Sequence, residues 1–109
     1  MTDFKKMEIF EDTTIREAIK AIDIGNLQLA IVVDKNRKLL GTLTDGDIRR
    51  GILNGLDIDS NIKGIYFRSP LVATLAESKK DILQKALDRK IHQVPIIDKN
   101  HHVIDIKQI

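Results

Sequence analysis

One short stretch of the chain gathers residue types that could bind a small polar ligand: positions 41–51, which read "GTLTDGDIRRG". An ionised aspartate only accepts hydrogen bonds, through two oxygens, so Asp47 suits the paired hydroxyl groups of a ribose. A phosphate, which Asp47 would repel, could lie instead at the N-terminus of a helix that starts at Thr44. Free N–H groups and the helix dipole favour an anion at such a place. The stretch is therefore a candidate site for a ribose and a neighbouring anion.

Other residues of the same stretch could complete that site. Thr44 offers a hydroxyl donor, and Arg49 or Arg50 offers a charged fork for a phosphate. Gly46 has no side chain and would let a ligand approach the backbone closely. The candidate ligand-binding residues of this stretch are thus Thr44, Gly46, Asp47, Arg49 and Arg50.

The same residues also have a purely structural interpretation. Thr44-x-x-Asp47 resembles a capping box, a pattern that starts a helix without any ligand. Arginines on a helix surface, such as Arg49 and Arg50, are usually solvated. The local pattern leaves both interpretations open, and the elements that position it must help to decide.

The composition limits the classes of function. A length of 109 residues suits one domain or two very small units that share a core. Aromatic residues make up only 4% of the chain, so the core must be aliphatic. The net charge of +2 is too balanced to indicate nucleic-acid binding, and the absence of cysteine excludes disulfides and thiolate chemistry. No apolar run approaches the roughly 20 residues of a membrane span, and the N-terminal segment is not a secretory signal, so a cytoplasmic protein is expected.

A repeat with an offset of 64 residues organises the chain. The tripeptide "DKN" occurs at 34–36 and again at 98–100. Each copy lies between two short apolar segments, "LAIVV" and "KLLGTL" around the first and "VPII" and "HVIDI" around the second. Two such segments separated by a polar turn predict a β-hairpin. The sequence therefore predicts two hairpins in equivalent positions of an internal duplication.

Upstream of each hairpin, the same offset aligns two predicted helix starts. Thr14 aligns with Ser78, and each opens a hydroxyl-x-x-acid pattern typical of a helix cap, with Glu17 and Asp81 as the acids. Apolar residues at helical spacing follow and predict the two buried faces: Ile15, Ala18, Ile19 and Ile22 in the first copy, and Ile82, Leu83, Ala86 and Leu87 in the second.

Three further signals complete the predicted order of elements. Gly25-Asn26 predicts the end of the first helix. A third helix is expected to start at Thr44, and "PLVATL" at 70–75 is expected to form a strand that enters the second copy. The predicted apolar face of the third helix consists of Ile48, Ile52 and Leu53.

This order, β-α-β-β-α followed by β-α-β-β, is typical of an α/β (α+β) fold in which each unit buries one helix face against a small sheet. The runs "AIVV" and "VPII" lack polar alternation, which predicts strands covered on both faces. The two sheets are therefore expected to pack against each other. Pro95, in the second run, favours an edge strand or a strand start.

The arrangement and its motifs resemble a tandem pair of cystathionine-β-synthase (CBS) domains, also called a Bateman module. The family pattern joins an apolar residue, Pro, two β-branched residues and Asp to a glycine, two apolar residues, Thr-x-x-Asp and a helix. "VPIID" in the second copy matches the first part, and Gly41, Thr42-Leu43, Thr44 and Asp47 match the second. The resemblance extends from about Met7 to Ile109, as one module over 1–109 with repeats at 7–60 and 61–109.

The resemblance implies regulation rather than catalysis. CBS pairs commonly bind adenine nucleotides such as AMP, ADP or ATP in the cleft between repeats, and they often form dimers. Thr44 and Asp47 occupy the positions of the recurrent ligand contacts. Leu29 and Ala30 could line a base pocket, although residues before a strand core are more often plain core. No cofactor is expected to be required, and no metal-binding residues are predicted.

The second repeat departs from the pattern. At the offset of 64, Gly41 aligns with Asp105 and Thr44 with Gln108, and the equivalent of Asp47 would be residue 111. The second repeat is therefore expected to be incomplete and to lack an intact site, either by degeneration or because the sequence is part of a longer protein. We favour the second explanation and expect one principal nucleotide site, centred on Asp47.

The ending "VPIIDKNHHVIDIKQI" resembles CBS pairs that precede sugar-phosphate nucleotidyltransferase domains, which implies an attached C-terminal catalytic domain. The alternative functions are a structural dimerisation module without a nucleotide and a small α/β enzyme. No pattern of a nucleophile with its base supports the enzyme. His101 and His102 are expected in a surface turn rather than in a metal site, because no carboxylate lies at a ligand spacing from them.

Overall fold

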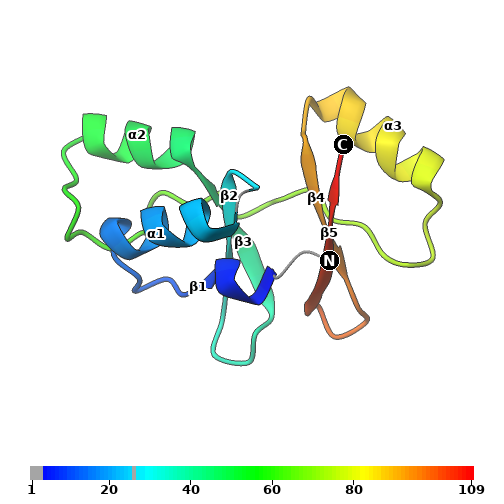
Figure 1. Cartoon of the computed structure of the whole chain (residues 1–109), viewed down its shortest axis with the longest axis horizontal. Helices are drawn as coiled ribbons and strands as arrows, with labels where there is room; N and C mark the ends of the chain where they lie inside the picture. Colours follow the sequence, from blue (N-terminus) through cyan, green and yellow to red (C-terminus); the bar gives the residue numbers. More distant parts are fainter. Residues whose placement is uncertain (1–3, 26) are drawn as a thin grey trace.

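Two small sheets and three α-helices make up the described part of the chain, residues 4–25 and 27–109 of a computed structural model (Figure 1). The elements are a 3₁₀-helix η1 (Phe4–Met7), β1 (Glu8–Ile9), α1 (Ile15–Gly25), β2 (Leu29–Val33), β3 (Leu39–Thr44), α2 (Asp45–Leu53), α3 (Lys79–Arg89), β4 (Gln93–Ile97) and β5 (Val103–Gln108). The first sheet has the order β1-β2-β3, with β1 parallel and β3 antiparallel to β2, and the second is the antiparallel pair β4-β5. The predicted α+β fold class is confirmed.

The internal duplication is confirmed element by element. The bounds of α3, β4 and β5 are those of α1, β2 and β3 displaced by 64 residues. The pairing repeats as well, because Ile9 lies opposite Val32 in a parallel pair and Ala73 lies opposite Ile96 in another. Each repeat therefore places one helix and one hairpin in the same relation.

The recurrence of "DKN" has a local physical cause in the hairpin turns. One carboxylate oxygen of Asp34 accepts hydrogen bonds from the backbone N–H groups of Asn36 and Lys38, at 2.8 and 3.0 Å. Asp98 does the same two and four residues along its own turn. The residue after each tripeptide, Arg37 or His101, has a left-handed backbone with φ of 62° or 67°. In each turn the aspartate carboxylate thus accepts hydrogen bonds from backbone N–H groups of the short loop.

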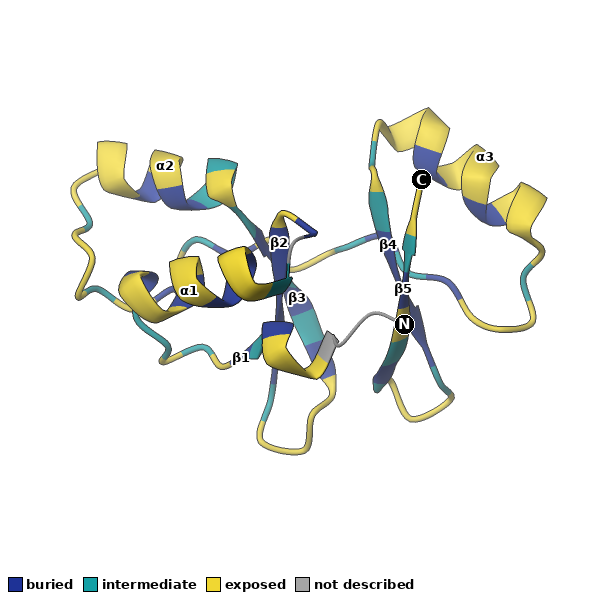
Figure 2. Cartoon of the chain, in the orientation of Figure 1, coloured by how far each residue is buried: buried dark blue, intermediate teal, exposed yellow. Residues whose placement is uncertain are grey.

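Three apolar clusters divide the fold into a helix layer, two sheets and a second helix layer (Figures 1 and 2). The first cluster lies between α1, α2 and the first sheet, and the third lies between α3 and the second sheet. The inter-sheet core joins the repeats and consists of Met7, Leu27, Leu29, Ile31, Val33, Leu39, Ile97, Val103 and Ile106. The expected packing through the sheets is confirmed.

Strand β2 is buried on both faces, as predicted. Leu29, Ile31 and Val33 belong to the inter-sheet core, while Ala30 and Val32 pack under the helices. Such a strand needs no polar alternation.

Pro95 fits within β4 because the pairing on one side of that strand is a single bridge. There Pro95 contributes only its carbonyl, which accepts a hydrogen bond from the N–H of Ala73 at 3.0 Å. The missing N–H of proline therefore costs this side of the strand no hydrogen bond.

Two predictions about the elements are wrong. The segment "PLVATL" forms no strand, and only Ala73 makes a bridge to β4. The predicted helix faces were too wide, because the sheets are narrow and cover only one side of each helix. Leu53 and Leu87 are 78% and 59% exposed, and Ile19, Ile52 and Leu83 are exposed as well. The buried positions include Ala21 on α1 and Gly51 on α2 instead.

The helix boundaries agree with their predicted signals. The hydroxyls of Thr14 and Ser78 accept hydrogen bonds from the N–H groups of Glu17 and Asp81, at 3.2 and 3.1 Å. Helix α1 ends at Gly25; Asn26, the second residue of the predicted stop signal, lies outside the described residues. Within the described chain, no helix has the length and apolar character needed to cross a membrane.

Acid is expected to destabilise the fold through the two hairpin turns. Backbone N–H donors, chiefly those of Lys38 and His102, lower the pKa values of Asp34 and Asp98 below the ordinary 3.8. Both carboxyls thus bind protons more weakly in the folded chain than in the unfolded chain. Their stabilising effect is complete at pH values above 3.8 and is lost as the pH falls through their lower pKa values in the folded state.

Urea denaturation at about pH 7 and about pH 3 measures this effect. The double variant Asp34→Asn, Asp98→Asn should lose less stability on acidification than the wild type. Asp23→Asn, which removes an exposed carboxylate of α1, should retain the wild-type pH dependence. An unchanged pH dependence in the double variant would contradict the role of the turns.

Candidate functional site

The junction between β3 and α2 is a complete capping box. Thr44 is the N-cap, and its hydroxyl accepts a hydrogen bond from the N–H of Asp47 at 3.3 Å. In return, Oδ2 of Asp47 accepts hydrogen bonds from the N–H and the hydroxyl of Thr44, at 3.0 and 3.1 Å. The structural interpretation of Thr44-x-x-Asp47 is therefore correct in this structure, and any ligand must use groups that the cap leaves available.

The same junction forms one wall of a cavity between the repeats. The cavity has a volume of about 440 Å³, within the range common for small-molecule sites. The first repeat contributes the ends of β2 and β3 and the start of α2, and the second contributes the segment that joins α3 to β4. The lining residues are Leu29, Thr42, Thr44, Asp47, Phe67, Pro70, Leu71, Arg89, Lys90, Ile91, His92, Gln93 and Pro95.

A backbone bridge brings an aromatic ring to this cavity. Thr42 and Phe67 exchange two backbone hydrogen bonds, of 3.0 and 2.8 Å. Gly41 permits this approach, because a Cβ there would collide with the carbonyl of Phe67 and with the ring of Tyr66. The ring of Phe67 remains 53% exposed beside the cavity, where it can stack on a flat apolar group.

Tyr66 anchors this bridge beneath the surface. Its hydroxyl donates to a carboxylate oxygen of Glu11 at 2.9 Å, and the guanidinium of Arg68 lies over its ring. Burial raises the pKa of Tyr66, and the neighbouring carboxylate of Glu11 raises it further. The phenol therefore remains a hydrogen-bond donor at neutral pH and fixes the segment that carries Phe67.

Three basic side chains face the cavity from the second repeat: Arg89, Lys90 and His92. Lys90 ends α3 in the left-handed conformation, with φ of 56° and ψ of 42°, at a position where glycine is usual. In the part of the chain that the structure describes, neither Arg89 nor Lys90 is engaged in a salt bridge. The charged groups of Arg89 and Lys90 on one wall thus lie across from the carboxylate of Asp47 on the other.

The candidate residues from the sequence divide into two groups. Leu29, Thr44 and Asp47 line the cavity, whereas Gly46, Ala30, Arg49 and Arg50 do not. Ala30 is fully buried in the cluster under the helices.

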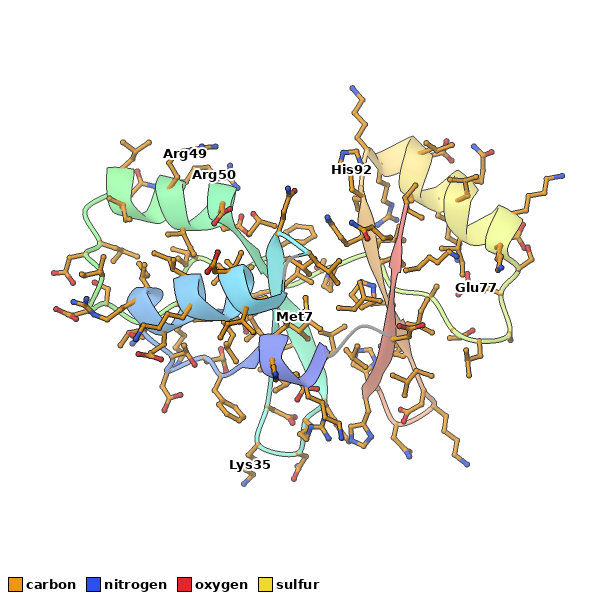
Figure 3. All side chains as sticks on the ribbon, in the orientation of Figure 1. Met7, Lys35, Arg49, Arg50, Glu77 and His92 are labelled. Carbon is orange, nitrogen blue, oxygen red and sulfur yellow. The ribbon has the colours of Figure 1, made fainter. Side chains whose placement is uncertain are left out.

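The two arginines of α2 lie on the outer surface of the helix (Figure 3). Nη2 of Arg50 donates a hydrogen bond of 2.7 Å to Oδ1 of Asp47. The space above Gly46 is taken by the same guanidinium, which lies 3.2 Å from where a Cβ would be. The close approach expected at Gly46 is thus made by Arg50.

The sequence did not indicate the second-repeat wall of the cavity. Arg89, Lys90 and His92 lie in "DRKIHQ", which has the ordinary appearance of a solvated helix end. The sequence signal that could have indicated this wall is the absence of a glycine at the end of α3. A non-glycine residue held in the left-handed region is often functional.

The histidines of the second hairpin lie away from the cavity. His101 takes the left-handed turn position, and the ring Nε2 of His102 lies 3.0 Å from the carbonyl oxygen of Asn36. No group of three or more His, Asp or Glu side chains within the described residues could hold a metal ion.

Two packed repeats with a cavity at their junction define a class of tandem α+β modules, and comparison with known proteins identifies the family. Residues 5–54 match the model of the CBS domain. The chain superposes on the CBS domain pair of protein MJ0100 in complex with 5′-methylthioadenosine and S-adenosyl-L-methionine, with 25% identity, a TM-score of 0.81 and coverage of 93% of this chain and 79% of that one. Residues 5–54 are therefore a CBS domain by sequence, and the chain has the fold of a CBS domain pair, a regulatory rather than catalytic module.

Two further known proteins are similar to this chain, one in structure and one in sequence. The CBS domain protein PAE2072 from Pyrobaculum aerophilum, complexed with AMP, shares the fold with a TM-score of 0.81, at 20% identity and over 93% of this chain and 78% of that one. The probable arabinose 5-phosphate isomerase of Haemophilus influenzae is 29% identical over 102 residues, which cover 90% of this chain and 29% of that protein. The chain spans about a third or less of the length of the curated relatives it matches.

The contribution of the cap to stability can be measured separately from any ligand. Thr44→Ala removes the acceptor for the N–H of Asp47 and one donor to its carboxylate, so it should lower the free energy of unfolding by about 1 kcal/mol. Urea denaturation at neutral pH measures the change. Thr44→Ser retains the hydroxyl and should stay close to the wild type; equal losses in the two variants would contradict the capping role.

Proposed function

We propose that this CBS pair is a regulatory module that binds an adenine nucleotide in the cavity between its repeats. The observation that carries the proposal is the pairing of opposite charges across one cavity, with Asp47 on the first repeat and Arg89 and Lys90 on the second. A nucleotide has a matching division, because its ribose hydroxyls donate hydrogen bonds and its phosphate accepts them.

Each part of an adenine nucleotide has a suitable partner in the lining. The ribose hydroxyls donate to the carboxylate of Asp47, which only accepts. The phosphate lies near Arg89 and Lys90, where charge-assisted hydrogen bonds are strong. The base fits between Leu29 and the exposed ring of Phe67, which offers a stacking surface. Gly46, Arg49 and Ala30 have no ligand contact in this arrangement.

The comparisons support this choice of ligand. The MJ0100 pair was determined with 5′-methylthioadenosine and S-adenosyl-L-methionine, and the Pyrobaculum protein with AMP. Both sets of ligands contain an adenosine-like unit. An adenine nucleotide is therefore the first ligand to test, with S-adenosylmethionine as the second.

In this proposal the module regulates an attached domain. The repeats at 7–60 and 61–109 would take up different relative arrangements with and without ligand, and the ligand shifts the balance by its differential affinity. The relatives are longer than this chain, which is compatible with a further attached domain. The resemblance noted above for the ending of the sequence makes a sugar-phosphate nucleotidyltransferase the first candidate.

A structural dimerisation module without a nucleotide is the second candidate function. The observation that favours it is the apolar surface on the outer helices, where Ile52, Leu53 and Leu87 are exposed. Homodimer formation is compatible with nucleotide binding, so ligand binding rather than oligomeric state separates the two functions.

Calorimetric titration with AMP, ADP, ATP, GTP and S-adenosylmethionine tests the proposal. The wild type should bind an adenine-containing ligand with a Kd below about 1 mM. Asp47→Asn should weaken binding about tenfold or more, because the ribose loses a charged acceptor. The fold should persist, since asparagine retains a side-chain oxygen for the cap.

The matched control is Asp45→Asn, which removes the same charge from an exposed residue in the first turn of α2 that does not line the cavity. It should bind as the wild type does. A wild type that binds none of the ligands while remaining folded would support the structural module instead.

Lys90 should show a conflict between stability and binding. Lys90→Gly relieves a left-handed lysine and should raise the free energy of unfolding by about 0.5 to 1 kcal/mol. It also removes an ammonium group from the proposed phosphate site and should weaken AMP binding several-fold. Lys90→Asn, which tolerates the conformation without the charge, should weaken binding equally. Urea denaturation and calorimetry measure the two quantities, and unchanged AMP affinity in both variants would place the phosphate elsewhere.

A further inference from the structure

Asp47 lies between two hollows of the surface. One is the cavity between the repeats, and the other is a groove between α2 and the segment that follows it, lined by Asp47, Arg50, Gly51, Asn54, Leu56, Gly64 and Ile65. Arg50 reaches the carboxylate from the groove and lines only that hollow. The side chain of Arg50 is 64% exposed, whereas that of Asp47 is 16% exposed.

The hydrogen bonds of Asp47 leave little capacity for a ligand. Oδ2 already accepts two bonds from Thr44, one from the N–H and one from the hydroxyl. Oδ1 accepts the 2.7 Å bond from Nη2 of Arg50. A carboxylate offers about two lone-pair positions on each oxygen, so one position remains on Oδ1. A diol that donates from both hydroxyls therefore needs a second position, which either Arg50 or the rotatable hydroxyl of Thr44 vacates, and Arg50 is the more exposed of the two.

Gly46 makes the contact between Arg50 and Asp47 possible. The guanidinium folds back over the first turn of α2, and a Cβ at Gly46 would lie 3.2 Å from its Nη1 and 3.5 Å from its Nη2. The distance to Nη1 is tighter than ordinary van der Waals contact, so the guanidinium would have to shift by a few tenths of an ångström, whereas the distance to Nη2 is ordinary. A residue with a side chain at this position would press the guanidinium away from the carboxylate.

We infer that Arg50 is an internal competitor for the ribose-binding carboxylate of Asp47, displaced when a diol-containing ligand binds. This inference rests on the proposed function. Arg50 is exposed, so its ion pair with Asp47 is weak and screened by salt, and a ligand can displace it at small cost. Displacement releases the guanidinium onto the outer surface of α2, which connects occupancy of the cavity to a change of charge distribution on the opposite side of the helix.

Paired titrations with AMP and 2′,3′-dideoxy-AMP isolate the effect. The ratio of the two dissociation constants reports the contribution of the ribose hydroxyls, because any influence of Arg50 on the phosphate affects both ligands. Arg50→Gln should raise the preference for AMP about two- to fivefold, the range expected for loss of an exposed ion pair. Gly46→Ala, which displaces the guanidinium without removing it, should change the ratio in the same direction.

Arg16→Gln is the matched control. It removes an exposed arginine of α1 that forms an ion pair with Asp59 outside the cavity. The ratio of the two dissociation constants should remain unchanged. If the wild type binds AMP and the ratio is unchanged or smaller in Arg50→Gln, Arg50 is not a competitor, and the proposed function stands. If the wild type binds neither ligand, both the proposed function and this inference are wrong.

Discussion

The packing of the two sheets against each other is the constraint on which the rest of the structure depends. Every residue of β2 is buried, because helices cover one face of the strand and the second sheet covers the other. Burial of this aliphatic surface stabilises the pair as one unit. Without the second repeat, the residues Leu29, Ile31 and Val33 would face water.

The same packing positions the candidate site. Both hairpins point in one direction, and their tips meet through the hydrogen bond from the N–H of Leu39 to the carbonyl of His101 (Figure 1). The opposite ends of the strands lie together as well, so the start of α2 at Thr44 faces the end of α3 at Lys90 across the cavity. A site that needs groups from both repeats is a direct consequence of this alignment.

Several residues at the cavity serve stability and chemistry in opposing ways. Asp47 caps α2 and also presents the carboxylate that a ribose would need, so its oxygens are partly committed before any ligand arrives. Lys90 holds a backbone conformation that suits glycine better, and in doing so it places a cation on the cavity wall. Backbone strain such as that of Lys90 is often found where a protein binds a ligand.

The sequence predicted most of the fold because its signals are local. The offset of 64, the two hairpins and the caps at Thr14, Thr44 and Ser78 each depend on residues within one turn or hairpin. The strand expected at 70–75 was wrong, because strand formation depends on a neighbour, and only Ala73 has one. The first-repeat wall of the site was predicted from Thr44 and Asp47.

The second wall could not be predicted in the same way. Arg89, Lys90 and His92 come near Asp47 only through the way the two sheets pack, and no spacing along the chain encodes that packing. Arg50 illustrates the same limit on a smaller scale. Its position next to Asp47 suggested a phosphate contact, whereas its side chain folds back over Gly46 to the carboxylate.

Mapping of amide chemical-shift changes by NMR during titration with AMP tests the central claim most directly, because it locates the ligand without any substitution. The account predicts that the largest changes fall on two separate segments, residues 42–47 at the start of α2 and residues 89–93 at the end of α3. Changes confined to one repeat, or centred on the hairpin tips or the outer helix faces, would contradict a nucleotide site shared between the two repeats.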